Sequence, residues 1–350
     1  MKTIQLLNYE RGRWLAGDGG RADIMSAIDG SVIATTGSSG VDFAAMLAHA
    51  RDIGGPALRA MTFHQRARML KGLGLAIMAR KEELYALNPL SGATRKDGWI
   101  DIEGGAMTLL SFSSKGRREL PDAHVLLDGD VEPLGKTGSF VGQHIYTPLQ
   151  GAAVHINAFN FPVWGMLEKL GPTLLAGMPA IVKPASSTAY LCEAAFRILI
   201  ETGLVPDGAL QLIVGGVGDL FDHLGGQDVV SFTGSASTAN KLKSHPVVLR
   251  ESVKFVAEQD SLNASVLGPD AGPETPEFDL FVKEVVNEMT VKAGQKCTAI
   301  RRALAPVEYL DAVEQAIRDR LAKTIVGDPR DEASRMGALV SCAQRDDVRG

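Results

Sequence analysis

The rhythm of apolar and polar positions changes near residue 150. Before that point, apolar residues recur at three- and four-residue spacing, which is typical of helices with one buried face. After an edge-strand pair at the start of the chain, this spacing predicts helices over 43–53, 63–78 and 81–87. A polar connector is expected over 113–130, and short extended runs follow at 138–148.

From Gly151 onward, short apolar runs alternate with helical segments. Strands are expected at 152–157, 180–183, 210–214 and 229–232, and helices at 163–175, 187–202 and 219–224. Strands separated by helices of this length form βαβ units and therefore a parallel sheet. The fold class is α/β, and a doubly wound sheet of this kind binds ligands at the carboxyl ends of its strands.

A second compositional unit opens near Ser252. Strands are expected at 254–257, 264–267 and 303–307, and helices at 281–290 and 309–323. The last thirty residues begin another helix and stop without a helix C-cap, so we expect the chain to be cut short.

Composition narrows the class of protein. The chain has 350 residues, about two domains' worth, with 36 basic and 41 acidic side chains and a net charge of −5. This balance argues against nucleic acid as the main partner. No apolar stretch reaches the roughly 18 residues that cross a bilayer, and the start becomes charged too early for a signal peptide. We therefore expect a cytoplasmic protein with no membrane partner.

The chain has three cysteines, Cys192, Cys297 and Cys342, which are odd in number and widely spaced. They predict neither a disulfide framework nor a metal site. Cys192 and Cys342 fall in predicted apolar helix faces and are expected to be core residues.

Cys297 has a different setting, because it follows a glycine turn next to Lys296 and precedes Arg301 and Arg302. Cationic neighbours lower the pKa of a thiol, and the thiolate is the nucleophilic form. The alternative is a small buried side chain.

Glu258 and Asn160 are candidates for acid–base and oxyanion chemistry. Glu258 ends a predicted buried strand, where a carboxylate with a raised pKa can act as a general base. The alternative is a strand-end charge that faces water. Asn160 precedes Phe161-Pro162, so its amide is held by a rigid turn, although asparagine is common in turns for other reasons.

Three strand ends are candidates for anion binding. Lys183 ends one strand and can reach a phosphate or a ribose, or extend into solvent. The run 215–218 (GGVG) follows a strand but lacks the last glycine of G-x-G-x-x-G, so alone it is a weak signal. Thr233-Gly234-Ser235 closes a strand before a helix, whose free backbone N–H groups can bind an anion.

The order of these motifs resembles that of the aldehyde dehydrogenase superfamily over essentially all 350 residues. The motifs are NFP, VKP, the glycine-rich turn, FTGS, the strand-end Glu258 and GQKC. The segments HINAFNFPVWGMLEKLGPTLLAGMPAIVKPA, EQDSLNASVLG and MTVKAGQKCTAIRR are similar to one branch in particular. That branch is the dehydrogenase half of the bifunctional phenylacetate-degradation proteins.

This resemblance implies an enzyme of phenylacetate breakdown. Its substrate is a CoA-linked aldehyde, 3-oxo-5,6-dehydrosuberyl-CoA semialdehyde, which is oxidised with NADP to the carboxylic acid. Cys297 attacks the aldehyde, its backbone N–H and Asn160 hold the oxyanion, and Glu258 activates the water that hydrolyses the thioester. The implied cofactor contacts are Lys183, Ser186, Gly216, Gly218, Phe232, Thr233, Gly234 and Ser235.

Ser186 bears on the choice of cofactor. Many NAD-preferring relatives carry a glutamate three residues after the VKP lysine, where it binds the adenosine ribose. A carboxylate about 3 Å from a 2′-phosphate costs on the order of 1 to 4 kcal/mol. Ser186 removes this repulsion and Lys183 supplies a cation, so we expect NADP to be preferred over NAD.

The resemblance also implies the domain organisation. Residues 1–122 and 148–255 form a dinucleotide-binding domain with a Rossmann-type parallel sheet, and 123–147 form a bridging hairpin for oligomerisation. Residues 256–350 begin a second, α/β catalytic domain. A Glu-x-Phe-Gly-Pro motif, the final oligomerising strand and the hydrolase half of the branch are missing, so a homo-oligomer is expected only for a full-length form.

Three alternatives remain open at this point. In the first, the chain is a truncated, non-catalytic cofactor-binding module. In the second, it oxidises another semialdehyde. In the third, it is a thiol acyltransferase that uses Cys297 without a nicotinamide.

Overall fold

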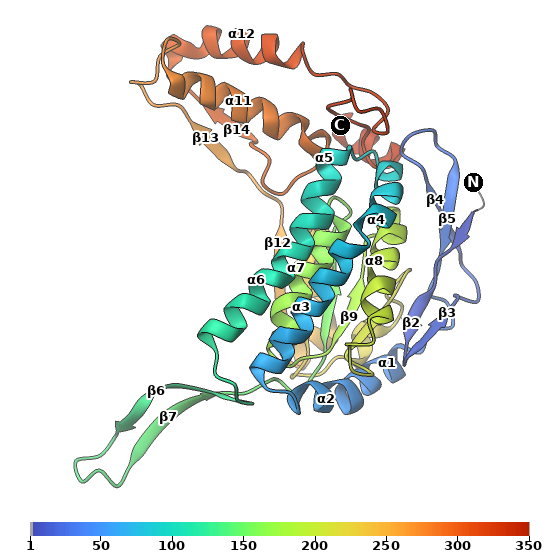
Figure 1. Cartoon of the computed structure of the whole chain (residues 1–350), viewed down its shortest axis with the longest axis vertical. Helices are drawn as coiled ribbons and strands as arrows, with labels where there is room; N and C mark the ends of the chain where they lie inside the picture. The colour runs from blue at the N-terminus through green and yellow to red at the C-terminus, as the bar shows by residue number, and fades with distance from the viewer. Residues whose placement is uncertain (1–2, 350) are drawn as a thin grey trace.

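The computed structural model describes residues 3–349, and in that range its centre is a seven-stranded sheet of order β12-β11-β8-β9-β10-β2-β3 (Figure 1). The first five strands in this order run parallel, β2 is antiparallel to β10, and β2 and β3 form a hairpin. The strands are β2 (Asn8–Glu10), β3 (Arg13–Leu15), β8 (Ala153–Ile156), β9 (Ala180–Lys183), β10 (Leu210–Leu212), β11 (Val229–Gly234) and β12 (Lys254–Gln259). The predicted α/β fold with a parallel sheet is confirmed.

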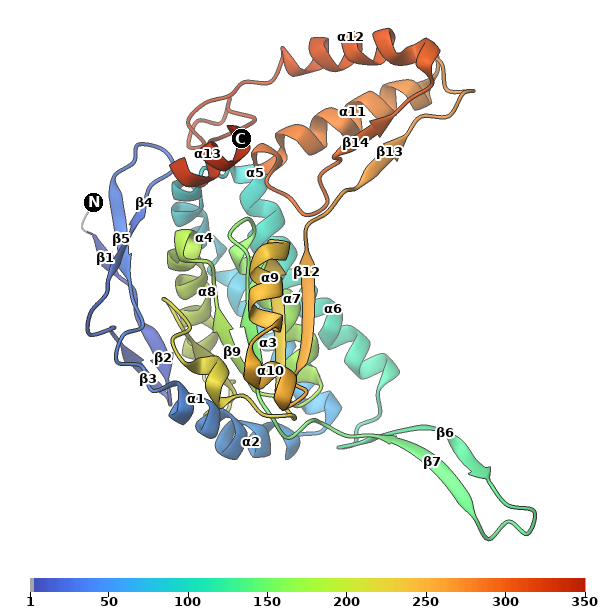
Figure 2. The same ribbon diagram turned by 180° about the vertical axis from the view of Figure 1, so that it is seen from behind.

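Helices cover both faces of this sheet. On the face seen in Figure 1 lie α3 (Phe63–Ala79), α4 (Lys81–Leu87), α6 (Gly104–Glu119), α7 (Pro162–Leu175) and α8 (Ala189–Glu201). On the opposite face, seen in Figure 2, lie α1 (Phe43–His49), α9 (Ala236–Lys243) and α10 (Pro246–Arg250).

The central strand β8 is buried along its whole length, and three of its four residues are apolar. Ala153 belongs to the core cluster under α3, α6, α7 and α8, and Val154 to the cluster on the other face. Successive side chains of a strand point to opposite faces, so a strand covered on both sides is largely apolar. The exception in β8 is the buried His155, whose Nε2 lies 3.1 Å from Thr173 Oγ1.

A smaller lobe follows β12 along the chain and lies at the top of Figure 1. It contains a parallel pair of strands, β13 (Ala264–Val266) and β14 (Arg302–Leu304), with the helices α11 (Pro276–Thr290) and α12 (Leu310–Leu321). Phe278, Val282 and Val313 belong to its separate core cluster. Helix α13 (Cys342–Arg349) follows this lobe.

A long hairpin leaves the body of the molecule at the opposite end (Figures 1 and 2). It is formed by β6 (Leu126–Pro133) and β7 (Val141–Tyr146), which pair antiparallel within the predicted segment 123–147. Its side chains include exposed large hydrophobic residues such as Leu127, Val131 and Phe140.

The remaining elements are short. The N-terminal sheet has the order β1-β5-β4, with β1 (Ile4–Gln5), β4 (Ala22–Met25) and β5 (Val32–Thr36). The short helices are η1 (Ala50–Gly54), α2 (Gly55–Arg59), η2 (Asn88–Ser91), α5 (Arg95–Gly98), η3 (Trp99–Glu103), η4 (Ser186–Thr188), η5 (Leu220–His223), η6 (Val291–Gly294) and η7 (Val307–Tyr309).

The predicted polar connector over 113–130 is wrong in its first part, because α6 continues to Glu119. The buried side of α6 is lined largely by small residues that apolar spacing does not detect. A Cβ placed on Gly116 would lie 2.8 Å from Cδ1 of Leu175, and one on Gly105 would lie 2.9 Å from the Cα of Trp164. The small residues therefore let α6 approach α7 closely.

Two further helix predictions are corrected. Segment 219–224 is not an α-helix but contains the short 3₁₀ helix η5. Helix α11 begins at Pro276, five residues before the predicted start, because Thr275 caps it by accepting the backbone N–H of Phe278.

The two cysteines predicted to be core residues differ. Cys192 is fully buried in α8, as predicted. The prediction for Cys342 is wrong, since it is the exposed first residue of α13 and that helix has no buried residue.

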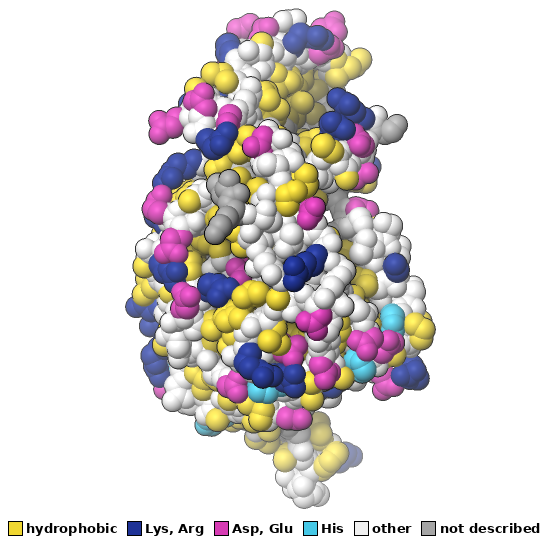
Figure 3. All heavy atoms as spheres, turned by 90° about the vertical axis from the view of Figure 1, so that its right-hand side faces the viewer, with side chains coloured by type: hydrophobic (Ala, Val, Ile, Leu, Met, Phe, Trp, Pro, Cys, Tyr) yellow, Lys and Arg dark blue, Asp and Glu magenta, His cyan; other side chains and the backbone are white. Residues whose placement is uncertain are grey.

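On the face shown in Figure 3, Lys and Arg side chains are interspersed with Asp and Glu rather than gathered by sign. Among residues 3–349, the structure contains no helix with the length and apolar character needed to span a membrane.

Candidate active site

The carboxyl ends of β11 and β12 bring together side chains from distant parts of the chain. Thr233 and Glu258 are register partners across this parallel pair, and Thr233 Oγ1 lies 3.5 Å from Glu258 Oε2. Lys169 of α7 donates from Nζ to the same Thr233 hydroxyl at 2.7 Å. A hydroxyl therefore links a cation to the carboxylate that the sequence singled out.

Cys297 lies in the loop after η6 and faces this group of side chains. Partial burial raises the pKa of its thiol, and the charge of Glu258 and a hydrogen bond with Glu258 raise it further. The charge of Glu168 acts in the same direction. The structure thus brings Cys297 and Glu258, from separate segments of the chain, together at one edge of the sheet.

The prediction that cationic neighbours lower the thiol pKa of Cys297 is wrong. Lys296 is directed to Glu288, with Nζ 2.7 Å from Oε1. The guanidinium of Arg301 donates to two backbone carbonyls, those of Gly294 and Lys296. The side chains of Lys296 and Arg301 therefore bind other groups and not the thiol. The charges that act on the thiol are those of the carboxylates Glu258 and Glu168.

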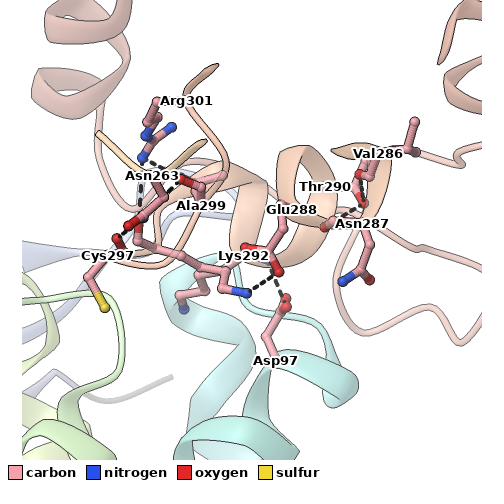
Figure 4. A network of polar contacts seen from close by, with 12 residues as sticks. Asp97, Asn263, Val286, Asn287, Glu288, Thr290, Lys292, Cys297, Ala299 and Arg301 are labelled. Atoms are coloured by element: carbon pink, nitrogen blue, oxygen red, sulfur yellow. Dashed lines mark hydrogen bonds and ion pairs between the residues drawn. The ribbon is translucent and has the colours of Figure 1, made fainter. Parts of the chain in front are cut away.

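Side chains from the segment after β12 hold the backbone of Cys297 (Figure 4). Asn263 Nδ2 donates to the carbonyl of Cys297 at 2.6 Å and to that of Ala299 at 3.1 Å. The hydroxyl of Ser261 donates to the same Cys297 carbonyl. The nucleophile candidate therefore sits on an anchored loop.

The prediction that Glu258 ends a buried strand is wrong. β12 is the edge strand of the seven-stranded sheet in the described chain, and five of its six residues are exposed. Glu258 is accordingly exposed itself.

Asn160 lies in the connection between β8 and α7, at the same edge of the sheet, and is half-buried. In residues 3–349 no hydrogen bond engages its side-chain amide, so the group is free to meet a ligand.

Glu168 and Lys169 were missed by the sequence reasoning. Burial raises the pKa of Glu168 and lowers that of Lys169, and Glu168 Oε2 accepts a hydrogen bond from the indole of Trp164 at 3.0 Å. The charge of Glu258 also raises the pKa of Glu168. The available signal was a Glu-Lys pair inside the otherwise apolar helix PVWGMLEKLGPTLL.

Lys183 and Ser186 fit an anionic ligand at the end of β9. Lys183 is half-buried, burial lowers the pKa of its ammonium, and it makes no ion pair within residues 3–349. Ser186, at the start of η4, is exposed beside it. A phosphate would supply the counter-charge that the described protein atoms do not.

The glycine-rich turn after β10 is shaped by packing. Gly218 has φ +47°, and a Cβ there would lie 2.5 Å from the ring of Phe43. Ser38 donates from its hydroxyl to the carbonyl of Gly216 at 2.6 Å. The turn leads into the short η5 instead of an α-helix, so it lacks the helix N-terminus of a dinucleotide turn.

Residues of the FTGS segment (232–235) also make contacts within the protein itself. Phe232 is buried and packs against Gly234. Ser235 caps α9 by accepting a backbone N–H of that helix, and the N–H of Ala236 donates to Asp260 Oδ1 at 3.3 Å. The start of α9 is therefore less open to an anion than predicted.

The part of the chain described by the structure contains no cluster of His, Cys, Asp and Glu side chains that can hold a metal ion.

A family model described as the Aldehyde dehydrogenase family matches residues 14–350. The chain belongs to the aldehyde dehydrogenase family. A curated relative, 3,4-dehydroadipyl-CoA semialdehyde dehydrogenase from Aromatoleum evansii, is 45% identical over 343 residues. The match covers 98% of this chain, which spans 66% of the length of that relative.

Solved structures of the family have the same fold. A point mutant of betaine aldehyde dehydrogenase from Staphylococcus aureus, in complex with NAD+, superposes with a TM-score of 0.86 at 22% identity. The match covers 99% of this chain and 67% of the other. For 3,6-anhydro-L-galactose dehydrogenase in complex with NAP the TM-score is 0.83 at 23% identity, with 97% of this chain and 69% of the other covered.

Proposed function

We propose that this chain binds NADP and oxidises an aldehyde to a carboxylic acid through a thioester on Cys297. The observation that carries the proposal is the contact of the Cys297 thiol with the Glu258 carboxylate at the carboxyl edge of a parallel sheet. Family membership gives this contact its chemical context.

The first covalent step forms a bond between Cys297 Sγ and the carbonyl carbon of the aldehyde. The thiol proton passes to solvent water in this step, and Glu258, which lies next to the thiol, acts as base only in the hydrolysis that follows. The Asn160 amide and the Cys297 backbone N–H stabilise the oxyanion of the thiohemiacetal, at roughly 3 kcal/mol for each donor. A bound nicotinamide would supply the hydride acceptor that converts this thiohemiacetal to the thioester.

The second step hydrolyses the thioester that remains on Cys297. Glu258 removes a proton from water, the water oxygen bonds to the acyl carbon, and the carbon–sulfur bond breaks to release the acid. Proton transfer by a positioned base contributes about 10²- to 10⁴-fold. Thr233 and Lys169 support this base, since Lys169 donates to the hydroxyl that faces Glu258.

Lys183 and Ser186 are the residues that would hold the 2′-phosphate of NADP. The half-buried ammonium of Lys183 has no carboxylate partner in residues 3–349, and Ser186 adds a hydroxyl without a negative charge. NAD is the alternative cofactor, and the solved relatives include complexes with NAD+ and with NAP.

The proposed substrate class is a CoA-linked semialdehyde. The 45% identical relative is named for 3,4-dehydroadipyl-CoA semialdehyde. The branch resemblance implies instead the longer 3-oxo-5,6-dehydrosuberyl-CoA semialdehyde of phenylacetate breakdown. A panel of CoA-linked and free aldehydes of graded length distinguishes these two, and it also tests other semialdehydes.

We assign the central sheet and its helices to cofactor binding, the hairpin 123–147 to association between copies of a full-length chain, and 256–350 to the catalytic lobe. The exposed apolar residues of the hairpin, such as Phe140 and Val141, support an association role.

The proposal is tested by following reduction of NADP by an aldehyde in the unmodified chain and in Cys297→Ala. Turnover that depends on both Cys297 and the nicotinamide supports it. Cofactor binding by calorimetry without turnover would identify a binding module, and turnover without a nicotinamide would identify an acyltransferase.

A further inference from the structure

The loop that carries Cys297 is tied to the body of the molecule through a buried lysine. Lys292 is only 3% exposed. Its Nζ donates to Ser91 Oγ at 3.0 Å. Its backbone N–H donates to Oδ1 of Asp97, which Figure 4 shows beside it, at 2.8 Å. Both partners lie about two hundred residues earlier in the chain, 201 and 195 positions away.

The backbone of this loop is held in an unusual conformation. Lys292 and Ala293 have φ values of 53° and 52°, in the left-handed region that non-glycine residues rarely adopt. Gly294 follows with φ 72°. The carbonyl of Lys292 accepts hydrogen bonds from both the backbone N–H and the side chain of Gln295. Contacts of the Lys292 side chain and backbone thus stabilise a turn that the chain would not adopt alone.

The charge of a second buried carboxylate, Asp101, also acts on the Lys292 ammonium. Asp101 is 2% exposed and accepts the backbone N–H of Trp164 at 2.8 Å. It therefore caps α7, whose own N-cap residue Phe161 makes no side-chain cap. The charges of Asp97 and Asp101 both act on Lys292. Lys292 thereby balances the charge of two buried carboxylates. Asp97 anchors the Cys297 loop, and Asp101 anchors α7, the helix that follows Asn160.

A buried carboxylate without a cation is costly, so the network holds together only when Lys292 is present. We infer that Lys292 is a positioning residue, which fixes the Cys297 loop against the start of α7 and so sets the thiol and the Asn160 amide in one geometry. This inference deepens the proposed function and rests on it for the role of the thiol.

The test compares Lys292→Met with Lys283→Met, which removes an exposed lysine from α11. The first readout is the rate of iodoacetamide alkylation at Cys297 against pH, followed on its own peptide because Cys342 is also exposed. This readout needs no dehydrogenase activity. The charged groups acting on the thiol are Glu258 of β12 and Glu168 of α7.

If Lys292 positions the loop, its loss moves the thiol away from Glu258. The pH at which the alkylation rate of Cys297 is half-maximal then falls, and the rate at pH 7.5 rises. If Lys292 were merely a nearby cation, its loss would instead raise this pH and slow the reaction. In turnover, Lys292→Met lowers kcat by about 100-fold, the scale of a 1 Å misplacement, with the Kd for NADP unchanged. Lys283→Met behaves as the unmodified chain.

Ser91→Ala provides a second variant, because it removes the Nζ acceptor and keeps the lysine. It shifts the alkylation profile in the same direction by a smaller amount, and it decides the question if Lys292→Met does not fold. Alkylation that is unchanged or slowed in the folded variants overturns the inference. An unmodified chain that fails to oxidise any aldehyde, with the alkylation shift present, overturns the proposed function alone.

Discussion

Thr233 of β11 and Glu258 of β12 are partners in a parallel register, and their side-chain oxygens Oγ1 and Oε2 lie 3.5 Å apart. The pairing places the carboxylate at the edge of the sheet where Cys297 reaches it from the smaller lobe. The consequences of this arrangement can be measured.

Replacing Glu258 with Gln keeps the size of the side chain and removes the base. We expect a burst of reduced cofactor followed by a steady state that is about 10²- to 10⁴-fold slower, because hydrolysis of the thioester lacks its proton acceptor. Rapid-mixing absorbance measurements show both phases. Loss of the burst itself would mean that Glu258 is required before the thioester forms.

The same substitution changes the pKa of Cys297. In the unmodified chain, burial and the charge of Glu258 raise the pKa of this thiol. Glu258→Gln removes the charge, so the midpoint of the alkylation rate at Cys297 moves to lower pH. Peptide mass spectrometry across a pH series measures this midpoint. A midpoint that moves upward would show that Glu258 does not act on the thiol in solution.

Ser186→Glu tests the choice of cofactor. A carboxylate at this position repels the 2′-phosphate by on the order of 1 to 4 kcal/mol, so the Kd for NADP rises about tenfold or more while that for NAD changes less. Isothermal calorimetry with both nucleotides measures the shift. Ser187→Glu is the matched control, with the same charge one residue away. Tighter binding of NAD than of NADP by the unmodified chain contradicts the role given to Ser186.

Asp101 makes stability depend on pH in a defined direction. Burial raises the pKa of Asp101 to about 7, above its unfolded value. Between pH 4 and 7 the folded state therefore binds more protons at this site, and the contribution of Asp101 to stability falls as the pH rises. Asp101→Asn removes this dependence and keeps an oxygen to accept the Trp164 N–H.

Urea unfolding at pH 5 and at pH 7.5 measures the effect. The quantity compared is the free energy of unfolding of Asp101→Asn minus that of the unmodified chain. This difference is more positive at pH 7.5 than at pH 5. An equal difference at the two pH values would show that Asp101 remains ionised in the folded protein across this range.

Much of the fold was predictable from the sequence because the buried strands are mostly apolar and alternate with helical segments. Ala180–Lys183 of β9 and Lys81–Leu87 of α4 were predicted with the observed bounds. Helix α6 was not predicted, because Gly105, Ser113 and Gly116 make its contact surface through small size instead of apolar character.

The sequence selected residues for the candidate site, but it did not indicate the charges around them. Motif order selected Cys297 and Glu258, whose contact the structure shows. Adjacency in sequence suggested that Lys296 acts on the thiol, yet its side chain pairs with Glu288. No local pattern marks Lys292 as buried, because its partners Ser91 and Asp97 come from a distant segment.

The thioester on Cys297 is the central intermediate of the proposed reaction, and trapping it is the most direct test. Glu258→Gln is mixed with NADP and a CoA-linked semialdehyde, quenched in acid and digested for mass spectrometry. The predicted result is a peptide containing Cys297 that carries the mass of the acyl group, together with an equivalent amount of reduced cofactor and no adduct in Cys297→Ala. Reduced cofactor formed by Cys297→Ala, or an acyl adduct on a residue other than Cys297, would contradict the proposed chemistry.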